Sequence, residues 1–285
     1  MTIRQISRVI DSVATSDGAG VKLRRSLGSS ATARVDPFLM LDEFYSDNPD
    51  DYLAGFPAHP HRGFETVTYI LDGHMLHEDN FGNRGELQAG GVQWMTAGRG
   101  IVHSEMPQQS EGRMRGFQLW LNLPAQDKMQ PATYRDIPAE QIPRRAFSGG
   151  HIRLIAGELS VDGQSVTGPA ASPVTQPIYA DVMLESDARI DQPLPESHAA
   201  LIYVYEGSLS DGQTPVAVNQ AAVLGAGDAV ALQAGGQGAR FLLLAAVPLN
   251  EPVVQYGPFV MNSRAEIEQA MRDYQAGHFG HAAAG

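Results

Sequence analysis

Two short triplets hold the residues whose types and spacing could do chemistry: His59-Pro60-His61 and His103-Ser104-Glu105. Alternate residues of a β-strand point to the same face of its sheet, so each extended triplet could aim two metal-binding groups in one direction. Two facing strands would then bring three imidazoles and one carboxylate together. Such a mixed nitrogen and oxygen set suits iron, copper, nickel, manganese or zinc and leaves positions open for a substrate. The triplets therefore predict a catalytic metal centre inside a β-barrel.

The segments around the triplets have the pattern of short strands that could position such a site. Strand-like runs bounded by Gly, Asn or Asp turns cover Glu65 to Leu71, Val92 to Thr96 and Phe117 to Leu123. Both triplets lie beside glycine-rich turns. Glu65 extends the first triplet to an H-x-H-x3-E pattern that continues the period of two.

The composition limits the class of protein. At 285 residues the chain has room for one large or two medium domains, and its 30 glycines and 18 prolines are typical of short strands and turns. The absence of cysteine excludes disulfides, thiolate ligands and a cysteine nucleophile. A formal net charge of −12 argues against direct, non-specific nucleic-acid binding. Because the start lacks an apolar signal-peptide core and no apolar run could span a bilayer, we expect a cytoplasmic protein.

The stretch from Pro124 to Arg145 is rich in proline and polar residues and predicts an extended linker between two halves. A long surface loop within one domain is the alternative interpretation. We place the division at residue 135, so that residues 1–135 form an N-terminal metal-binding domain. Residues 136–285 then form a C-terminal domain without metal ligands.

A faint internal repeat supports the two halves. Tyr69 to Gly73 is similar to Tyr203 to Gly207, and the glycine-rich turn at Gly90 is similar to the one at Gly227. Chance similarity among turn-rich strands is the competing explanation. If the repeat is real, the ligands of the first half fall in the second half on residues that bind no metal: Pro193, Pro195, Arg240 and Leu242. One metal per chain follows.

The C-terminal segment has a helical pattern and no predicted chemical role. Ser263-Arg264-Ala265-Glu266 is a capping box, and apolar residues then recur at helical spacing. Gly277 supplies a stop signal. We expect one short amphipathic helix that packs on a barrel.

The remaining histidines and the large apolar residues have simpler interpretations than metal binding. His74 and His77 follow a hairpin glycine and are three apart, out of strand register, so we expect them to be solvated. We expect His198, His278 and His281 to have no role in the site. The residues expected in the barrel core, some of which would line an apolar pocket mouth, are Trp94, Met95, Phe117, Leu119 and Trp120.

Four longer strings give the chain a family resemblance. H-x-H-x3-E followed by a hairpin and G-x2-H (Gly100 to His103) resembles the two motifs of cupins. Gly55 to Thr66, Gln93 to Pro107, Phe117 to Pro124 and Gly257 to Asn262 resemble the hallmark stretches of one cupin family, the pirins. The similarity covers most of the first 150 residues and returns at the C-terminus.

The resemblance implies an all-β bicupin, which is two cupin-type β-barrels with a short C-terminal helix, and a metal in the N-terminal barrel alone. It implies four metal ligands: His59, His61, His103 and Glu105. Glu65 is not a ligand in the pirin pattern, and we expect it to orient a ligand imidazole. The alternative is a plain strand carboxylate near Arg62 or Arg99.

The resemblance also implies an activity. Several pirins resemble quercetin 2,3-dioxygenases, which use Fe(II) and O2 to open the flavonol ring with release of carbon monoxide. Glu105 would take the proton of the flavonol 3-hydroxyl. The alternative function is a redox-sensitive regulator that binds a transcription factor or a metabolic enzyme, and a structural or vestigial metal is a third reading. Other divalent transition metals fit the same ligands, and the family suggests a monomer.

Overall fold

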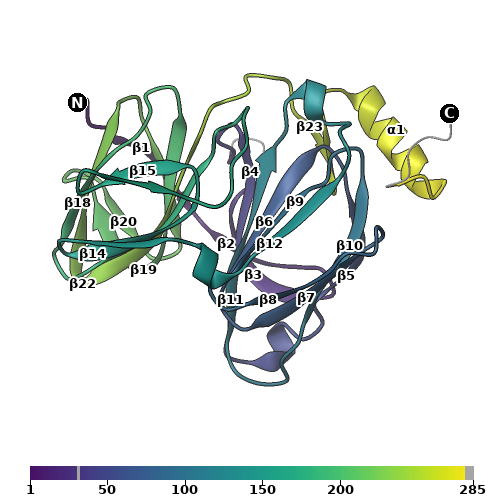
Figure 1. Cartoon of the computed structure of the whole chain (residues 1–285), viewed down its shortest axis with the longest axis horizontal. Coiled ribbons are helices and arrows are strands. Elements are labelled where there is room, and N and C mark those ends of the chain that lie inside the picture. Colours follow the sequence, from purple (N-terminus) through teal and green to yellow (C-terminus); the bar gives the residue numbers. More distant parts are fainter. Residues whose placement is uncertain (31–32, 280–285) are drawn as a thin grey trace. The chain divides into compact units, whose positions relative to one another are not determined.

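The computed structural model describes residues 1–30 and 33–279 and consists mainly of β-strands with one C-terminal α-helix (Figure 1). The chain forms two compact units, which it enters more than once. Unit 1 contains Met1–Val13, Ser26–Pro37 and Glu140–Pro248. Unit 2 contains Ala14–Arg25, Phe38–Ala139 and Leu249–Gly285. The domain boundary expected at residue 135 stays a prediction.

Unit 2 is built on two antiparallel sheets. The larger has the order β12-β9-β6-β11-β4-β3-β2, with bounds β2 Val13–Asp17, β3 Val21–Leu27, β4 Phe38–Ser46, β6 Phe64–Asp72, β9 Val92–Thr96, β11 Met114–Asn122 and β12 Thr133–Ile137. The smaller has the order β5-β10-β7-β8, with bounds β5 Phe56–His61, β7 His74–Asp79, β8 Arg84–Gln88 and β10 Ile101–Pro107. Single turns of 3-10 helix cover Pro49–Asp51 and Ala125–Asp127.

The two sheets of unit 2 share an apolar core. Its buried side chains come from both sheets and include Phe44 and Ile70 of the larger sheet and Phe56 and Met75 of the smaller one. Alternation along each strand points these residues to one face, where burial of apolar surface holds the sheets together. This packing fixes the smaller sheet, which carries both predicted ligand triplets.

Unit 1 contains a sheet of nine strands and a separate hairpin. The sheet comprises β1 Ile6–Asp11, β13 Arg144–Phe147, β14 Gly150–Ala156, β17 Ile178–Leu184, β18 Arg189–Pro193, β19 Ala199–Ser210, β20 Pro215–Ala217, β21 Gln220–Leu224 and β22 Ala229–Ala246. The hairpin pairs β15 Glu158–Val161 with β16 Gln164–Thr167, and a 3-10 turn covers Ala139–Gln141. The first part of β22 pairs with β18, and its last part pairs with β17 and β19. The sheet therefore curls around a core of aliphatic side chains with Phe241 among them.

The structure confirms the predicted all-β class and the predicted strands, with shifts of a few residues at their ends. The linker prediction is wrong in part. Residues Thr133–Ile137 form β12, which pairs with β9 at the edge of the larger sheet, and Arg144–Phe147 form β13. These pairings depend on partners distant in the sequence, so the proline pattern alone could not show them.

The C-terminal segment of unit 2 forms the short hairpin β23 Val254–Tyr256 with β24 Phe259–Met261, followed by α1 Arg264–Gln275 (yellow in Figure 1). The predicted capping box is present: the Ser263 Oγ accepts a hydrogen bond from the Glu266 amide at 3.3 Å. The helix ends at Gln275 with Ala276 as its C-cap residue, and Gly277 has a φ of 72°. Such a positive φ favours glycine at a helix end. Within residues 1–30 and 33–279, no helix has the length and apolar character to cross a bilayer.

Replacing Ser263 by alanine removes this cap and leaves the Glu266 amide without its acceptor. We expect the free energy of unfolding to fall by about 1 kcal/mol, measured by urea denaturation. Ser110→Ala, at an exposed loop position, is the matched control and should change stability by less than about 0.5 kcal/mol. Equal effects of the two substitutions would contradict the capping role.

Candidate metal centre

Strands β5 and β10 bring the two triplets together. They pair antiparallel, with His103 opposite His59 and Ile101 opposite His61. Residues directly opposite in an antiparallel pair have their Cβ atoms about 5 Å apart, and residues two apart share a face. Antiparallel pairing thus converts the spacing seen in the sequence into a cluster of three imidazoles.

The three histidine rings are in mutual contact. Ring centroids lie 4.4 Å apart for His59 and His103, 4.7 Å for His59 and His61, and 5.0 Å for His61 and His103. One nitrogen from each ring lies within 4.8 Å of the other two. His61 and His103 are buried and His59 is partly exposed. The arrangement suits a metal ion held between the three rings, of which His59 is the one nearest to solvent.

Hydrogen bonds leave ring nitrogens free to bind a cation. The His59 Nδ1 lies 2.9 Å from the Pro57 carbonyl, to which it can only donate, so its Nε2 keeps a lone pair. That Nε2 lies 3.0 Å from the Nε2 of His61. The His103 Nε2 is buried and has no hydrogen-bond partner among the described residues. A buried polar atom without a partner is costly, and a metal ion would satisfy it.

The protonation of the cluster also fits metal binding. Burial, together with the neighbouring His59, lowers the pKa of His61 well below its usual value. Burial and the other imidazoles lower the pKa of His103 in the same way. Both rings are therefore neutral near pH 7, and the neutral imidazole is the form that binds a metal. The residues present fit a divalent transition metal.

Glu105, the fourth predicted ligand, is buried on β10 but lies outside the cluster of three close nitrogens. Its Oε1 accepts a hydrogen bond from the Thr68 Oγ1 at 2.9 Å, and its Oε2 accepts one from the Gln118 Nε2 at 2.8 Å. The register of β10 against β5 shifts between His103 and Glu105. Sequence reasoning did not identify Thr68 and Gln118, because they lie on β6 and β11 and meet Glu105 only in the folded chain.

The prediction for Glu65 is wrong. Its Oε1 accepts hydrogen bonds from the Thr96 Oγ1 at 2.8 Å and the Trp94 Nε1 at 3.1 Å, and from no histidine among the described residues. The period-two pattern fails because Gly63, with a φ of 89°, ends β5 before β6 begins. On β6, Glu65 points to the face opposite Thr68. Burial raises the pKa of the Glu65 carboxyl.

The prediction for His77 is also wrong, because this residue is buried and touches the cluster. Its exposed fraction is 1%, its ring stacks on Tyr134 with centroids 4.4 Å apart, and its Nδ1 lies 3.3 Å from the Nδ1 of His103. The signal was Met75, an apolar residue two positions earlier on the same face of β7. His74 is partly exposed, with its Nε2 3.4 Å from Glu86.

Aromatic residues form one wall of the cluster. The rings of Phe64 and Trp120 lie 5.1 and 5.2 Å from the ring of His61, centroid to centroid. The Trp120 Nε1 donates to the Gln118 Oε1 at 3.4 Å. All five residues predicted for the core are buried: Trp94, Met95, Phe117, Leu119 and Trp120. The site is thus bordered by flat apolar surface as well as by polar groups.

Comparison with known proteins identifies the family. Residues 20–121 match the family model described as Pirin, and residues 179–280 match the Pirin C-terminal cupin domain. The chain belongs to the pirin family. The two matches also establish the pair of cupin domains, in agreement with the predicted bicupin fold.

Relatives of this pirin cover nearly the whole chain. A Pseudomonas aeruginosa protein named "Putative quercetin 2,3-dioxygenase" is 58% identical over 267 residues, which is 92% of this chain and 93% of the relative. Human pirin is 41% identical over 267 residues, covering 91% of this chain and 88% of its own. The solved structure of a quercetin 2,3-dioxygenase from Acinetobacter baumannii has a TM-score of 0.89 and 32% identity, covering 98% and 99% of the two chains.

The C-terminal segment of this pirin supports the ligand strands. Arg62, which follows His61, donates to the Asp273 Oδ2 at 2.6 Å and to the Arg99 carbonyl at 2.6 Å. Its guanidinium lies 4.5 Å from the ring centre of Phe279. Asn80 donates to the Phe279 carbonyl at 3.0 Å and accepts from the Val102 amide. Groups from α1 and the residues after it therefore contact residues that lie next to β5 and β10. Of the two histidines predicted to have no role in this segment, His278 is exposed and His281 lies outside the described residues.

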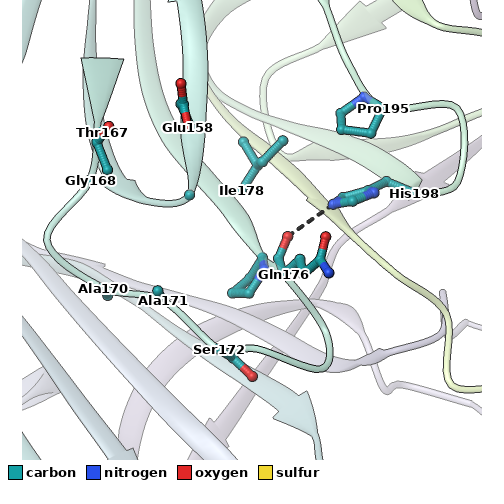
Figure 2. Close-up of a pocket in the computed structure, with 12 residues that line it drawn as sticks. Glu158, Thr167, Gly168, Ala170, Ala171, Ser172, Gln176, Ile178, Pro195 and His198 are labelled. Atoms are coloured by element: carbon teal, nitrogen blue, oxygen red, sulfur yellow. Dashed lines mark hydrogen bonds between the residues drawn. The ribbon is translucent and has the colours of Figure 1, made fainter. Parts of the chain in front are cut away.

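Unit 1 of the pirin has a cavity without a histidine cluster among its described residues. It has a volume of about 300 Å³, and its lining includes Glu158, Ile178, Pro195 and His198 (Figure 2). The His198 Nε2 lies 2.9 Å from the Gln176 carbonyl (dashed in Figure 2), and its Nδ1 lies 3.2 Å from the Ser197 hydroxyl. Both ring nitrogens of His198 are occupied. Among the described residues, the one group placed to hold a metal is the cluster in unit 2.

A buried lysine stabilises the turn after the first triplet. The Lys128 Nζ donates to the Gly63 carbonyl at 2.7 Å, the Asn122 Oδ1 at 2.7 Å and the Val260 carbonyl at 3.1 Å. One ammonium thus joins the end of β5, the end of β11 and strand β24. Burial lowers its pKa to about 8.

This pKa predicts a specific dependence of stability on pH. Between pH 8 and about 10.5, the usual pKa of lysine, the unfolded chain keeps a proton at Lys128 that the folded chain has lost. Stability therefore rises with pH in this window, by up to about 3 kcal/mol in total. We expect the unfolding free energy of the wild type to increase by that amount relative to Lys128→Met, in urea titrations from pH 7 to pH 10.5. Lys22→Met, at an exposed lysine, should show no such trend; a constant difference between Lys128→Met and wild type would contradict the assignment.

Proposed function

We propose that this pirin is an iron-dependent quercetin 2,3-dioxygenase, with Fe(II) bound by His59, His61, His103 and Glu105. The observation that carries the proposal is the cluster of three imidazoles whose free nitrogens lie within 4.8 Å of one another. The names of the relatives point to the same activity. We infer the metal and the substrate from this combination.

Glu105 is the proposed fourth ligand because a carboxylate has capacity beyond its present bonds. Each of its oxygens accepts one hydrogen bond, from Thr68 or from Gln118, and each has a second lone pair. It lies two residues after His103 on the same strand. A carboxylate and three neutral imidazoles would leave a divalent ion with a site charge of +1.

The same carboxylate is the proposed catalytic base. A Fe(II) ion in the site would supply Lewis acidity toward a deprotonated hydroxyl and a binding position for O2. Glu105 would take the proton of the flavonol 3-hydroxyl, and Thr68 and Gln118 would keep the carboxylate oriented during the transfer. One O2 is consumed and one carbon monoxide released for each flavonol opened.

The apolar wall fits a flat aromatic substrate. Phe64 and Trp120 pack on each other with ring centroids 4.3 Å apart, and both are buried beside His61. Aromatic faces at this position would stack on the fused rings of a flavonol and orient its oxygens toward the histidines. The partly exposed His59 marks the side from which such a ligand would enter.

The first test is oxygen uptake with quercetin by the Fe(II)-loaded protein, with carbon monoxide measured in parallel. We expect many turnovers with equal amounts of O2 consumed and carbon monoxide released. His103→Ala should remove both the bound iron and the turnover, because it deletes the buried nitrogen that faces the cluster. His74→Ala, on the neighbouring strand outside the cluster, is the matched control and should retain both.

A protein that binds one iron per chain but takes up no oxygen with quercetin would contradict the dioxygenase activity. The proposed ligand set would remain supported. A screen for protein partners at both oxidation states of the iron would then test the regulatory alternative. Cytoplasmic location and a monomeric state remain predictions from the sequence and the family.

A further inference from the structure

A line of buried side chains continues from the cluster into the protein behind His103. The Nδ1 of His103 lies 3.3 Å from the Nδ1 of His77, and the Nε2 of His77 lies 3.4 Å from the Oδ2 of Asp79. His77 and Asp79 lie on β7, which pairs with β10 in the smaller sheet of unit 2. Their side chains are 1% and 0% exposed. Water therefore does not compete for these contacts.

The chemistry of the line fixes where each proton sits. Asp79 accepts hydrogen bonds from two backbone amides and one side-chain amide, so both of its oxygens act as acceptors. The His77 Nε2 facing this carboxylate must then carry the proton, which leaves the His77 Nδ1 as an acceptor. In consequence the His103 Nδ1 is the donor between the two rings. The His103 Nε2 that faces the cluster is left with its lone pair.

We propose that His77 and Asp79 are positioning residues that fix His103 in the tautomer whose Nε2 can bind a metal ion. The proposal deepens the proposed metal centre and rests on it for the metal, but the tautomer itself is a property of the metal-free protein. Partners behind a ligand imidazole commonly set its tautomer and orientation in this way. Neither residue belongs to the group of three close histidine nitrogens.

Both members of the line are held rigidly. The Asp79 Oδ1 accepts from the Phe81 and Asn83 amides at 2.9 and 3.0 Å, and its Oδ2 accepts from the Asn83 Nδ2 at 2.9 Å. The His77 ring stacks on Tyr134 at an interplanar angle of 23°. The Tyr134 hydroxyl in turn donates to Asp136 at 2.5 Å and accepts from Gln93 at 3.1 Å. The His77 ring therefore cannot turn away from His103 without losing this stacking.

The direct test reads the tautomers in the metal-free wild-type protein by long-range ¹H–¹⁵N correlation NMR of the histidine side chains. We expect a protonated Nδ1 and an unprotonated Nε2 for His103, and the opposite tautomer for His77. A protonated Nε2 at His103 would overturn the proposal. This measurement needs no variant, no metal and no activity.

Asp79→Asn should reverse the direction of the hydrogen bonds that join residue 79, His77 and His103. The asparagine oxygen can still accept from the Phe81 and Asn83 amides, so the turn is preserved. Its NH2 group would donate to the His77 Nε2, and the His77 Nδ1 would then carry the proton and donate to His103. We expect the His103 tautomer to invert and the affinity for Fe(II), measured by anaerobic titration, to fall about 10- to 100-fold.

Two further variants separate positioning from a merely structural role. His77→Ala should weaken Fe(II) binding like Asp79→Asn, whereas His77→Gln, whose amide oxygen can accept from the His103 Nδ1, should restore most of the affinity. His74→Ala is the matched control on the same strand and should leave the affinity unchanged. Full Fe(II) affinity in Asp79→Asn, with its His103 tautomer unchanged, would overturn the proposal.

The proposal and the proposed function can fail separately. If the wild type binds Fe(II) and shows the expected tautomers but does not consume oxygen with quercetin, the dioxygenase fails and the positioning role stands. If it consumes oxygen while His103 carries its proton on Nε2 before metal binding, the positioning role fails and the dioxygenase stands.

Discussion

The antiparallel pairing of β5 with β10 is the constraint on which the site depends. It places His103 opposite His59 and brings His61 to the same face, so three imidazoles meet on one side of this pair of strands. Other interactions keep this pair of strands in register. Lys128 ties the end of β5 to β11 and β24, and Arg62 ties it to Asp273 of the C-terminal helix. A close approach at Gly63, where an added Cβ would lie 2.0 Å from the Val260 carbonyl, explains why glycine ends this strand.

The two units differ in the side chains that fill their interiors. In unit 1 the core is formed by aliphatic side chains, including Leu154, Ile202 and Leu243, and the cluster of three close histidines among the described residues lies in unit 2. In unit 2 the apolar core around Phe44 and Ile70 occupies only part of the interior. The remainder holds histidines, Glu105 and their hydrogen-bond partners. Each buried polar group there needs a partner, and the unpaired His103 Nε2 is the atom that a metal would satisfy.

The sequence predicted the strands and the three histidines well, because both follow from local rules. A period of two is visible within His59-Pro60-His61 and does not depend on the rest of the chain. The prediction for Glu65 was wrong because the same rule was extended across the turn at Gly63, which lies between β5 and β6. His77 was missed because its burial depends on the pairing of β7 with β10, and Thr68 and Gln118 were missed because no local pattern links them to Glu105. The strand β12 within the expected linker was missed for the same reason, because its partner β9 is distant in the sequence.

The histidine cluster of unit 2 is the proposed metal site of this pirin. The most direct measurement is anomalous diffraction at the iron edge from crystals of the protein loaded with Fe(II) under anaerobic conditions. We expect one strong peak per chain, at bonding distance from a nitrogen of His59, His61 and His103 and from an oxygen of Glu105. A peak elsewhere in the chain, with none at the cluster, would contradict it.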